Sequence, residues 1–362
     1  MTAFLDNIFG KKQATSPRRV VGIDLGSTSI KVVELESRDN VINLTTYGEI
    51  LIGPYGDGSL GDAITLDPKQ EQTALIDVFR ESAVQATSAV FAVHLASSFV
   101  TVINLPKLGP DTDVAGQVPV EARKYIPMPI NEVTLDWAEI TRAEQDKAAD
   151  HQEVLLAAIQ NEVLQRLNTL MQRTNLPDQP TEIECFSIIR SVYQANYGER
   201  VAIIDLGGSS AKLYVVRQGL LEQLHRVRSG GTHITKQLAE DLSTDFTDAE
   251  VRKREYDGAS DEIGYTIRRV HEKMLGKTLH ELQQVLQNYE KDHGSEIDKV
   301  ILTGGVTQYP QITGLVEEAL SRKTVVGNPF NKVAYPAFME DVIKEIGPTF
   351  AVALGAALQR FE

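Results

Sequence analysis

The sequence of 362 residues predicts an α/β protein made of two similar halves, because one short motif occurs twice, half a chain apart. The first copy, residues 23–33, reads IDLGSTSIKVV, and the second copy, residues 204–214, reads IDLGGSSAKLY. Each copy has apolar, largely β-branched residues on both sides of a Gly/Ser turn, which is the pattern of a β-hairpin. A third stretch, residues 299–303 (KVILT), reads as a buried strand and leads through two glycines into a helical pattern over residues 312–320. These observations predict sheets covered by helices.

Composition and charge restrict the function. Apolar residues make up 42% and charged residues 24% of the chain, as in folded proteins, so we expect little intrinsic disorder. The formal net charge of −14 argues against broad nucleic-acid binding, which needs a cationic surface. Cys185 is the single cysteine, which excludes an intramolecular disulfide and a cysteine-based zinc site. The longest apolar run near the end, residues 350–358, is shorter than the roughly 20 residues that cross a bilayer. Since the start also lacks a signal-peptide pattern, we expect a soluble cytoplasmic protein.

The first nineteen residues differ from the rest of the chain, because they are basic and amphipathic. Phe4, Leu5, Ile8 and Phe9 recur at helical spacing, and two lysines follow them. This pattern is consistent with a short foot that contacts a membrane surface or a partner. It is equally consistent with a frayed, solubilised terminus.

The two hairpin turns carry the residue types that a polyphosphate site needs. An Asp that ends a buried strand can hold a hydrated metal ion, and turn glycines let backbone N–H groups approach phosphate oxygens. Hydroxyls add donors, and a lysine supplies positive charge. The candidate residues are Asp24, Gly26, Ser27, Thr28 and Lys31 in the first copy, and Asp205, Gly207, Gly208 and Ser209 in the second.

Two further elements are candidates for the nucleoside part of a ligand. Gly304, Gly305 and Val306 follow the third strand and would place bare backbone beside a flat ring such as adenine, although an ordinary tight turn explains them equally. Glu250 and Lys253 share a helix face, so Glu250 could accept hydrogen bonds from ribose hydroxyls. A solvated ion pair is the alternative interpretation of these two residues.

These motifs together resemble the actin, heat-shock-chaperone and sugar-kinase ATPase superfamily, and within it the PilM family of type IV pilus assembly. The stretches that carry the likeness are VVGIDLGSTSIKVVEL near the start, EIECFSIIRS in the middle, and NPFNKVAYPAF followed by EIGPTFAVALGAAL at the end. FtsA, the actin-like cell-division protein, is similar more distantly. The resemblance spans residues 20–361 and implies an actin-like ATPase fold, with two ribonuclease-H-like halves and an FtsA-type insertion called IC.

The resemblance also implies roles for individual residues. It implies ATP held between the two hairpins, with Mg²⁺ held through water by Asp24 and Asp205, and it places Asp205 among the catalytic residues. In chaperone and actin relatives, the residue that orients the attacking water lies where the two halves connect, and Glu184 is the best match there by position. A first-turn acid that only interacts with the helix dipole is the other interpretation of Glu184.

The predicted domain organisation follows from the motifs and the resemblance together. We expect a first-half core interrupted by one α/β insertion, and then a second half with its own smaller subdomain. The predicted boundaries are 1–19 for the basic segment, 20–90 for the first-half core (IA), 91–159 for the inserted IC subdomain, 160–195 for the rest of this core and the connecting helix, and 196–362 for the second half (IIA), with IIB at about 235–292.

The function that this interpretation predicts is a cytoplasmic nucleotide-binding scaffold with slow or no ATP hydrolysis. The resemblance implies that its partner is PilN, whose cytoplasmic N-terminal tail would lie in the groove between the first-half core and the insertion. Other inner-membrane components of the pilus machine and self-association belong to the same expectation. The protein would then be peripheral to the inner membrane through its partners.

Three other functions of the same fold deserve comparison. A sugar or acetate kinase needs a second substrate site and a general base, and no extra acidic motif accompanies the hairpins. A chaperone needs a client-binding domain, which we do not expect after the closing helix. An FtsA-like filament protein is the strongest alternative, although FtsA typically ends in an amphipathic membrane helix and the ending QRFE does not read as one.

Overall fold

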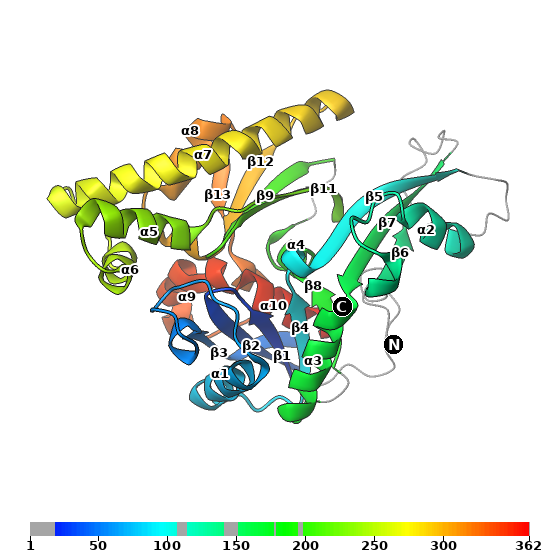
Figure 1. Cartoon of the computed structure of the whole chain (residues 1–362), viewed down its shortest axis with the longest axis horizontal. Helices are drawn as coiled ribbons and strands as arrows, with labels where there is room; N and C mark the ends of the chain where they lie inside the picture. The colour runs from blue at the N-terminus through cyan, green and yellow to red at the C-terminus, as the bar shows by residue number, and fades with distance from the viewer. Residues whose placement is uncertain (1–18, 107–113, 141–150, 177–178, 195–197, 362) are drawn as a thin grey trace.

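The computed structural model describes residues 19–106, 114–140, 151–176, 179–194 and 198–361. The predicted basic segment at residues 1–19 lies outside this part of the chain, apart from Arg19. The described residues form two five-stranded sheets and one three-stranded sheet, with helices packed around them (Figure 1). This arrangement confirms the predicted α/β fold with two similar halves.

The first sheet has the strand order β3-β2-β1-β4-β8. β1, β2 and β3 form an antiparallel meander, and β4 and β8 extend the sheet on the other side of β1 in parallel. Val20, Val21 and Ile23 of β1 are completely buried, which explains why this β-branched run forms a central strand. The strands span Arg19–Leu25 (β1), Ser29–Arg38 (β2), Val41–Leu51 (β3), Ser88–Val93 (β4) and Thr181–Ile183 (β8).

The second sheet repeats this topology in the order β11-β10-β9-β12-β13. β9 pairs antiparallel with β10 and parallel with β12, as β1 does with β2 and β4. The predicted buried strand at residues 299–303 is β12. The strands span Arg200–Leu206 (β9), Ala211–Arg217 (β10), Leu220–Val227 (β11), Lys299–Thr303 (β12) and Thr324–Val326 (β13).

The third sheet is a separate antiparallel unit in the order β5-β7-β6, and Figure 1 shows it extending away from the two larger sheets. Together with helix α2 it encloses its own small core. β4, which overlaps the start of the segment predicted as the insertion, belongs to the first five-stranded sheet, so the third sheet begins only at Ser98. The elements span Ser98–Pro106 (β5), Val114–Ala122 (α2), Val133–Glu139 (β6) and His151–Gln160 (β7).

Helices cover the two five-stranded sheets. The connecting helix α4, Glu184–Val192, begins directly after the short strand β8. Within the described residues, no helix is long and apolar enough to cross a membrane. The remaining helices span Pro68–Glu81 (α1), Asn161–Arg173 (α3), Gly231–Leu242 (α5), Phe246–Arg254 (α6), Glu262–His293 (α7), Ile312–Leu320 (α8), Glu340–Ile346 (α9) and Ala351–Leu358 (α10).

Helix α10 returns from the second half of the chain to the first sheet. It packs on β1 and on α4, and all eight of its residues are buried. Gly22 makes the approach to β1 possible, because a Cβ there would lie 1.9 Å from the carbonyl oxygen of Ala353. The two halves are therefore joined both by the connection after α4 and by the segment that leads into α10.

Candidate functional site

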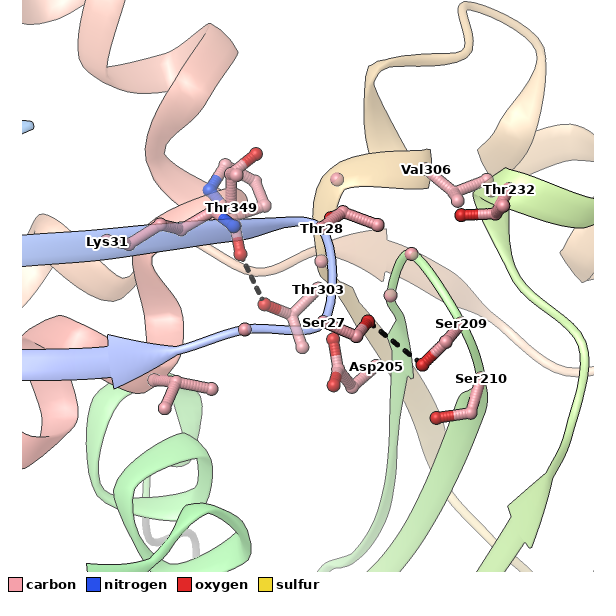
Figure 2. Close-up of a pocket in the computed structure, with 18 of the residues that line it drawn as sticks. Ser27, Thr28, Lys31, Asp205, Ser209, Ser210, Thr232, Thr303, Val306 and Thr349 are labelled. Atoms are coloured by element: carbon pink, nitrogen blue, oxygen red, sulfur yellow. Dashed lines mark hydrogen bonds between the residues drawn. The ribbon is translucent and has the colours of Figure 1, made fainter. Parts of the chain in front are cut away.

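The two hairpin turns face each other across the space between the halves. The hydroxyl of Ser27 donates a hydrogen bond to that of Ser209 at 3.0 Å, and Figure 2 shows this contact joining the two turns. In both copies the strand register sets a lysine directly opposite the strand-ending aspartate, with Lys31 across from Asp24 and Lys212 across from Asp205. The sequence duplication therefore produces a site with approximate twofold symmetry.

A cavity of about 220 Å³ lies between the turns and extends toward the second half. Every residue that the sequence analysis proposed for nucleotide, metal or catalysis lines this cavity. They are Asp24, Gly26, Ser27, Thr28, Lys31, Glu184, Asp205, Gly207, Gly208, Ser209, Glu250, Lys253, Gly304, Gly305 and Val306.

Two positions at this site must be glycine, because neighbouring parts of the chain come too close for a side chain. A Cβ on Gly208 would lie 2.5 Å from the methyl carbon of Thr28, so the second turn can meet the first only without a side chain there. Gly304 has a φ of +90°, and a Cβ on it would lie 2.5 Å from a carboxylate oxygen of Asp205. The strand–glycine–helix element thus brings bare backbone against the second hairpin, as the sequence predicts.

The first hairpin leaves its aspartate without a direct partner. The ammonium group of Lys31 donates to the Ser29 hydroxyl at 2.5 Å and forms an ion pair with Glu49 at 3.2 Å. No donor among the described residues hydrogen-bonds to the Asp24 carboxylate. Burial therefore raises the pKa of Asp24, against the opposing effect of Lys31 and His94. A carboxylate in this state would be stabilised by an added cation.

The second hairpin is different, because its lysine is paired with two carboxylates. The Lys212 ammonium group lies 3.0 Å from Asp205 Oδ2 and 2.7 Å from Glu184 Oε2. Burial alone would lower the pKa of Lys212, but Asp205 and Glu184 outweigh burial and raise it. Lys212 is therefore a permanent cation in the floor of the cavity.

Glu184 is held by several donors at once. Its Oε1 accepts from the backbone N–H of Leu95 at 2.8 Å, and its Oε2 accepts from Lys212 and lies 3.2 Å from His94 Nδ1. The other ring nitrogen of His94 faces the carbonyl oxygen of Leu25. Burial lowers the pKa of His94, but Glu184 outweighs burial and raises it, which favours the protonated ring that can donate from both nitrogens. Burial raises the pKa of Glu184, but Lys212 and His94 outweigh it and hold the pKa well below its ordinary value. The carboxylate is thus an anion held by three donors, two of them at Oε2.

The predicted ribose pair lies on one side of the cavity, and Glu250 is buried there. Its carboxylate accepts from the Thr235 hydroxyl at 2.5 Å and from Lys253 and Arg254 at 2.6 Å each. Three donors thus bind this carboxylate, and a direct contact of Glu250 with ribose stays a prediction. Glu250 and Lys253 do form the ion pair of the alternative interpretation, but the pair is buried rather than solvated, because Glu250 is only 2% exposed.

The turn at Gly304–Val306 lies next to a buried stack of aromatic rings. Val306 follows the two glycines in the short 3₁₀ helix that ends at Gln308. Just beyond it, Tyr309 stacks on His271 with ring centroids 4.1 Å apart and planes inclined by 6°. Both residues line the cavity, but they are only 3% and 5% exposed and Tyr256 also stacks on Tyr309. The surface that this end offers to a flat base is therefore the bare backbone at Gly305, where a Cβ would meet nothing within 4 Å.

The two aspartates that were predicted to hold Mg²⁺ are not equally suited to do so. Mg²⁺ prefers oxygen ligands and keeps several water molecules. Asp24 fits such an ion, because its carboxylate lines the cavity without a bound donor, whereas Asp205 is already neutralised by Lys212. The described residues contain no group of three or more His, Cys, Asp and Glu side chains that could hold a metal by themselves. A metal here would therefore be held largely through water and the ligand.

Several charged residues of the cavity were not predicted from the sequence, among them Lys212, His94 and Glu49. The sequence did indicate Lys212, because it occupies the same position in the second copy of the repeat as Lys31 does in the first. It did not indicate His94 and Glu49, since they reach the site only through the pairing of β4 and of β3 with their neighbours.

The chain is similar to known proteins in sequence and in structure. A sequence model of the family described as type IV pilus assembly protein PilM matches residues 22–361. Among curated proteins, the cell division protein FtsA of Enterococcus faecalis is 22% identical, over 89% of this chain and 84% of FtsA. FtsA of Rhizobium meliloti is 28% identical over 42% of this chain and 39% of FtsA.

Several solved structures share the fold. A PilM–PilN type IV pilus biogenesis complex superposes with a TM-score of 0.79 at 23% identity, covering 96% of this chain and 100% of that one. The ethanolamine utilization protein EutJ from Carboxydothermus hydrogenoformans gives 0.54 at 16% identity, covering 96% and 92%. MreB5 of Spiroplasma citri bound to AMPPNP gives 0.50 at 12% identity, covering 94% and 95%. The fold is thus that of the actin-like ATPases, as the sequence predicts.

Proposed function

The chain belongs to the type IV pilus assembly protein PilM family, and from this premise we propose that it is a nucleotide-binding scaffold of the pilus assembly machine. The observation that carries the proposal is the match of the family over residues 22–361, which includes both hairpins and the closing helix. The FtsA relatives favour a second candidate, an FtsA-like filament protein of cell division. Direct binding of a pilus partner, as tested below, separates the two functions.

The ligand that we propose for the cavity is ATP with Mg²⁺. The Gly/Ser turns that flank Ser27 and Ser209 would hold the phosphates, and the bare backbone of the Gly304–Val306 turn would receive the adenine. Support comes from MreB5, whose structures contain AMPPNP and ADP. Asp24 would hold the hydrated magnesium ion, and Lys253 lies at the ribose side. Glu250 then acts by fixing Lys253 and Arg254 rather than by contacting ribose directly.

Titration calorimetry with ATP and Mg²⁺ tests this proposal. The full-length protein should bind, and Asp24→Ala should weaken binding in Mg²⁺ by about 2–10-fold, because the hydrogen bonds that Asp24 would make through the hydrated ion contribute roughly 0.5–1.5 kcal/mol net. Asp57→Ala is a control, since this carboxylate does not line the cavity. Unchanged affinity in Asp24→Ala would argue against the proposed placement of the metal.

We propose that turnover is slow or absent, because Glu184 is committed to other groups. A carboxylate that accepts from Leu95, Lys212 and His94 has little capacity left to orient an attacking water. Purified protein should hydrolyse ATP far more slowly than the median enzyme rate of about 10 s⁻¹. Glu184→Gln should leave ATP binding nearly intact and lower any residual hydrolysis. Turnover near the median rate without a partner would refute this part of the proposal.

The partner that we propose is the cytoplasmic N-terminal tail of PilN, which would hold the protein at the inner membrane. Support comes from the superposed structure, which is a PilM–PilN complex, and from the three-stranded unit, whose sheet the nucleotide cavity does not need. This unit exposes Val120 on α2 to 63% and Tyr125 just after α2 to 41%, which are suitable apolar anchors for an extended tail.

A synthetic PilN tail labelled with a fluorophore tests the partner. Val120→Asp with Tyr125→Asp should weaken its binding at least about tenfold, which corresponds to roughly 1.4 kcal/mol. Tyr265→Asp on α7 is the matched control, because Tyr265 is also 63% exposed but lies in the second half. ATP affinity should be the same in all three proteins. Equal tail binding to the two variants would exclude this surface.

A further inference from the structure

We infer that Lys212 is a built-in counterion of the nucleotide pocket, which supplies at Asp205 the positive charge that magnesium supplies at Asp24. This inference rests on the proposed binding of ATP and goes beyond it, because it assigns different tasks to two aspartates that the sequence repeat makes look equivalent. The observation behind it is the different environment of the two Asp/Lys pairs.

In the second copy, the lysine is bound to its aspartate. The Lys212 ammonium group is 3.0 Å from Asp205 and 2.7 Å from Glu184, and its side chain is 10% exposed. These two hydrogen bonds use two of its three N–H donors, and Lys212 lines the cavity. The third donor is therefore available to a phosphate oxygen of a bound nucleotide.

In the first copy, the lysine is bound elsewhere. Lys31 also stands opposite its aspartate in the strand register, but its ammonium group contacts Ser29 and Glu49. Asp24 is 7% exposed and has no hydrogen-bond donor among the described residues. A carboxylate that is mostly removed from water and lacks a partner gains most from an added cation.

A metal ion and Lys212 would compete for the same place. A hydrated Mg²⁺ bound at Asp205 would stand within a few Å of the ammonium group, where two positive charges repel strongly in a poorly solvated site. Moving Lys212 away would also remove one of the three donors that hold the buried carboxylate of Glu184, which costs free energy. The metal therefore belongs on the Asp24 side.

The consequence is a reduced dependence of nucleotide binding on Mg²⁺. Lys212 and Lys31 remain in place when the metal is removed, so part of the phosphate charge stays compensated. The measurable quantity is the ratio of the ATP dissociation constant in EDTA to that in Mg²⁺, obtained by calorimetry on the full-length protein. We expect a ratio below about tenfold, a difference of less than roughly 1.4 kcal/mol.

Four variants test the role of Lys212. They form two pairs, each of which changes the same position in the two copies of the repeat. Asp24→Asn should bring the ratio close to one, whereas Asp205→Asn should leave it near the wild-type value. Lys212→Met should raise the ratio at least about tenfold, because it frees Asp205 for the metal and removes the fixed charge. Lys31→Met, the matched control, should weaken binding in both buffers without changing the ratio.

The outcomes separate the inference from the function on which it rests. A ratio that falls equally in Asp205→Asn and Asp24→Asn, or that stays unchanged in Lys212→Met, would overturn the role of Lys212 while leaving ATP binding in place. Absence of ATP binding to the wild-type protein in both buffers would overturn the proposed function as well. Circular dichroism checks the fold, and if Lys212→Met does not fold, the two aspartate variants still decide.

Discussion

At the scale of single residues, the environment of His271 decides its charge. This ring is 3% exposed, and its Nδ1 donates to the carbonyl oxygen of Ile267 at 2.8 Å. One face of the ring stacks on Tyr309. Burial lowers the pKa of His271 to about 4, against the effect of this hydrogen bond, so the ring is neutral in the folded protein at pH 7.

The neutral state of His271 predicts a loss of stability in mild acid. Between the ordinary histidine pKa of about 6.5 and the folded value of about 4, the unfolded chain binds one more proton than the folded chain. The free energy of unfolding therefore falls as the pH falls through this window, by about 2 kcal/mol between pH 7 and pH 5 from this residue.

Urea unfolding at pH 7 and pH 5 measures this effect against His271→Phe, which keeps an aromatic ring but cannot titrate. Other groups that titrate contribute equally to both proteins, so the difference between their pH dependences isolates His271. The variant should lose about 2 kcal/mol less than the wild type between the two pH values. Parallel pH dependences would mean that the buried ring is not neutral.

At the scale of elements, the sequence predicts local structure well where pattern and turn chemistry agree. The two hairpins, the strand at Lys299–Thr303 and the helix at Ile312–Leu320 lie where the sequence analysis places them. The sequence does not predict which sheet β4 belongs to, because the apolar pattern of a strand is the same in either sheet. The site residues were found through the repeat, whereas the ionic contacts of Lys212 and His94 depend on tertiary pairing.

The close crossing of α4 and α10 depends on the absence of a side chain at Gly355. A Cβ on Gly355 would lie 1.8 Å from the carbonyl oxygen of Ser187, so the two helices touch backbone to backbone. Next to this contact, Arg190 of α4 binds Glu182 through both nitrogens, at 2.6 and 2.7 Å, and donates to the Gly355 carbonyl oxygen at 3.1 Å. The close crossing of the helices and the buried Arg190–Glu182 ion pair therefore stabilise each other.

We predict that Gly355→Ala lowers the free energy of unfolding by about 2–3 kcal/mol or more, because overpacking against backbone cannot be relieved by a rotamer change. Gly276→Ala is the matched control, since Gly276 lies in helix α7 with nothing within 4 Å of its Cβ position. There the substitution should stabilise by about 0.5–1 kcal/mol through helix propensity alone. Urea unfolding of both variants measures the difference, and equal effects would mean that the α4–α10 contact adjusts freely.

At the scale of the whole molecule, the two halves also meet outside the hairpin turns. The loop between β3 and α1 reaches the second half, where the Thr232 hydroxyl donates to the Gly61 carbonyl oxygen at 3.4 Å. A Cβ on Gly61 would lie 2.6 Å from the carboxylate carbon of Glu250. Glu250 is fixed by Thr235, Lys253 and Arg254 and cannot move aside at little cost. The contact at Gly61 therefore joins the two halves beside the cavity, which Gly61 and Glu250 both line.

We predict that Gly61→Ala weakens ATP binding about tenfold or more, because the added methyl group disfavours the closed arrangement that a ligand between the halves requires. Gly219→Ala is the control, since both glycines have left-handed backbones, with φ of +83° and +80°, but a Cβ on Gly219 would meet nothing within 4 Å. Both variants carry the same backbone cost of roughly 1–2 kcal/mol, so their difference reports the contact between the halves. Calorimetry gives the affinities, and hydrogen exchange in residues 53–66 should slow on ATP binding in Gly219→Ala but not in Gly61→Ala. Equal affinities in the two variants would mean that this loop does not take part in closure.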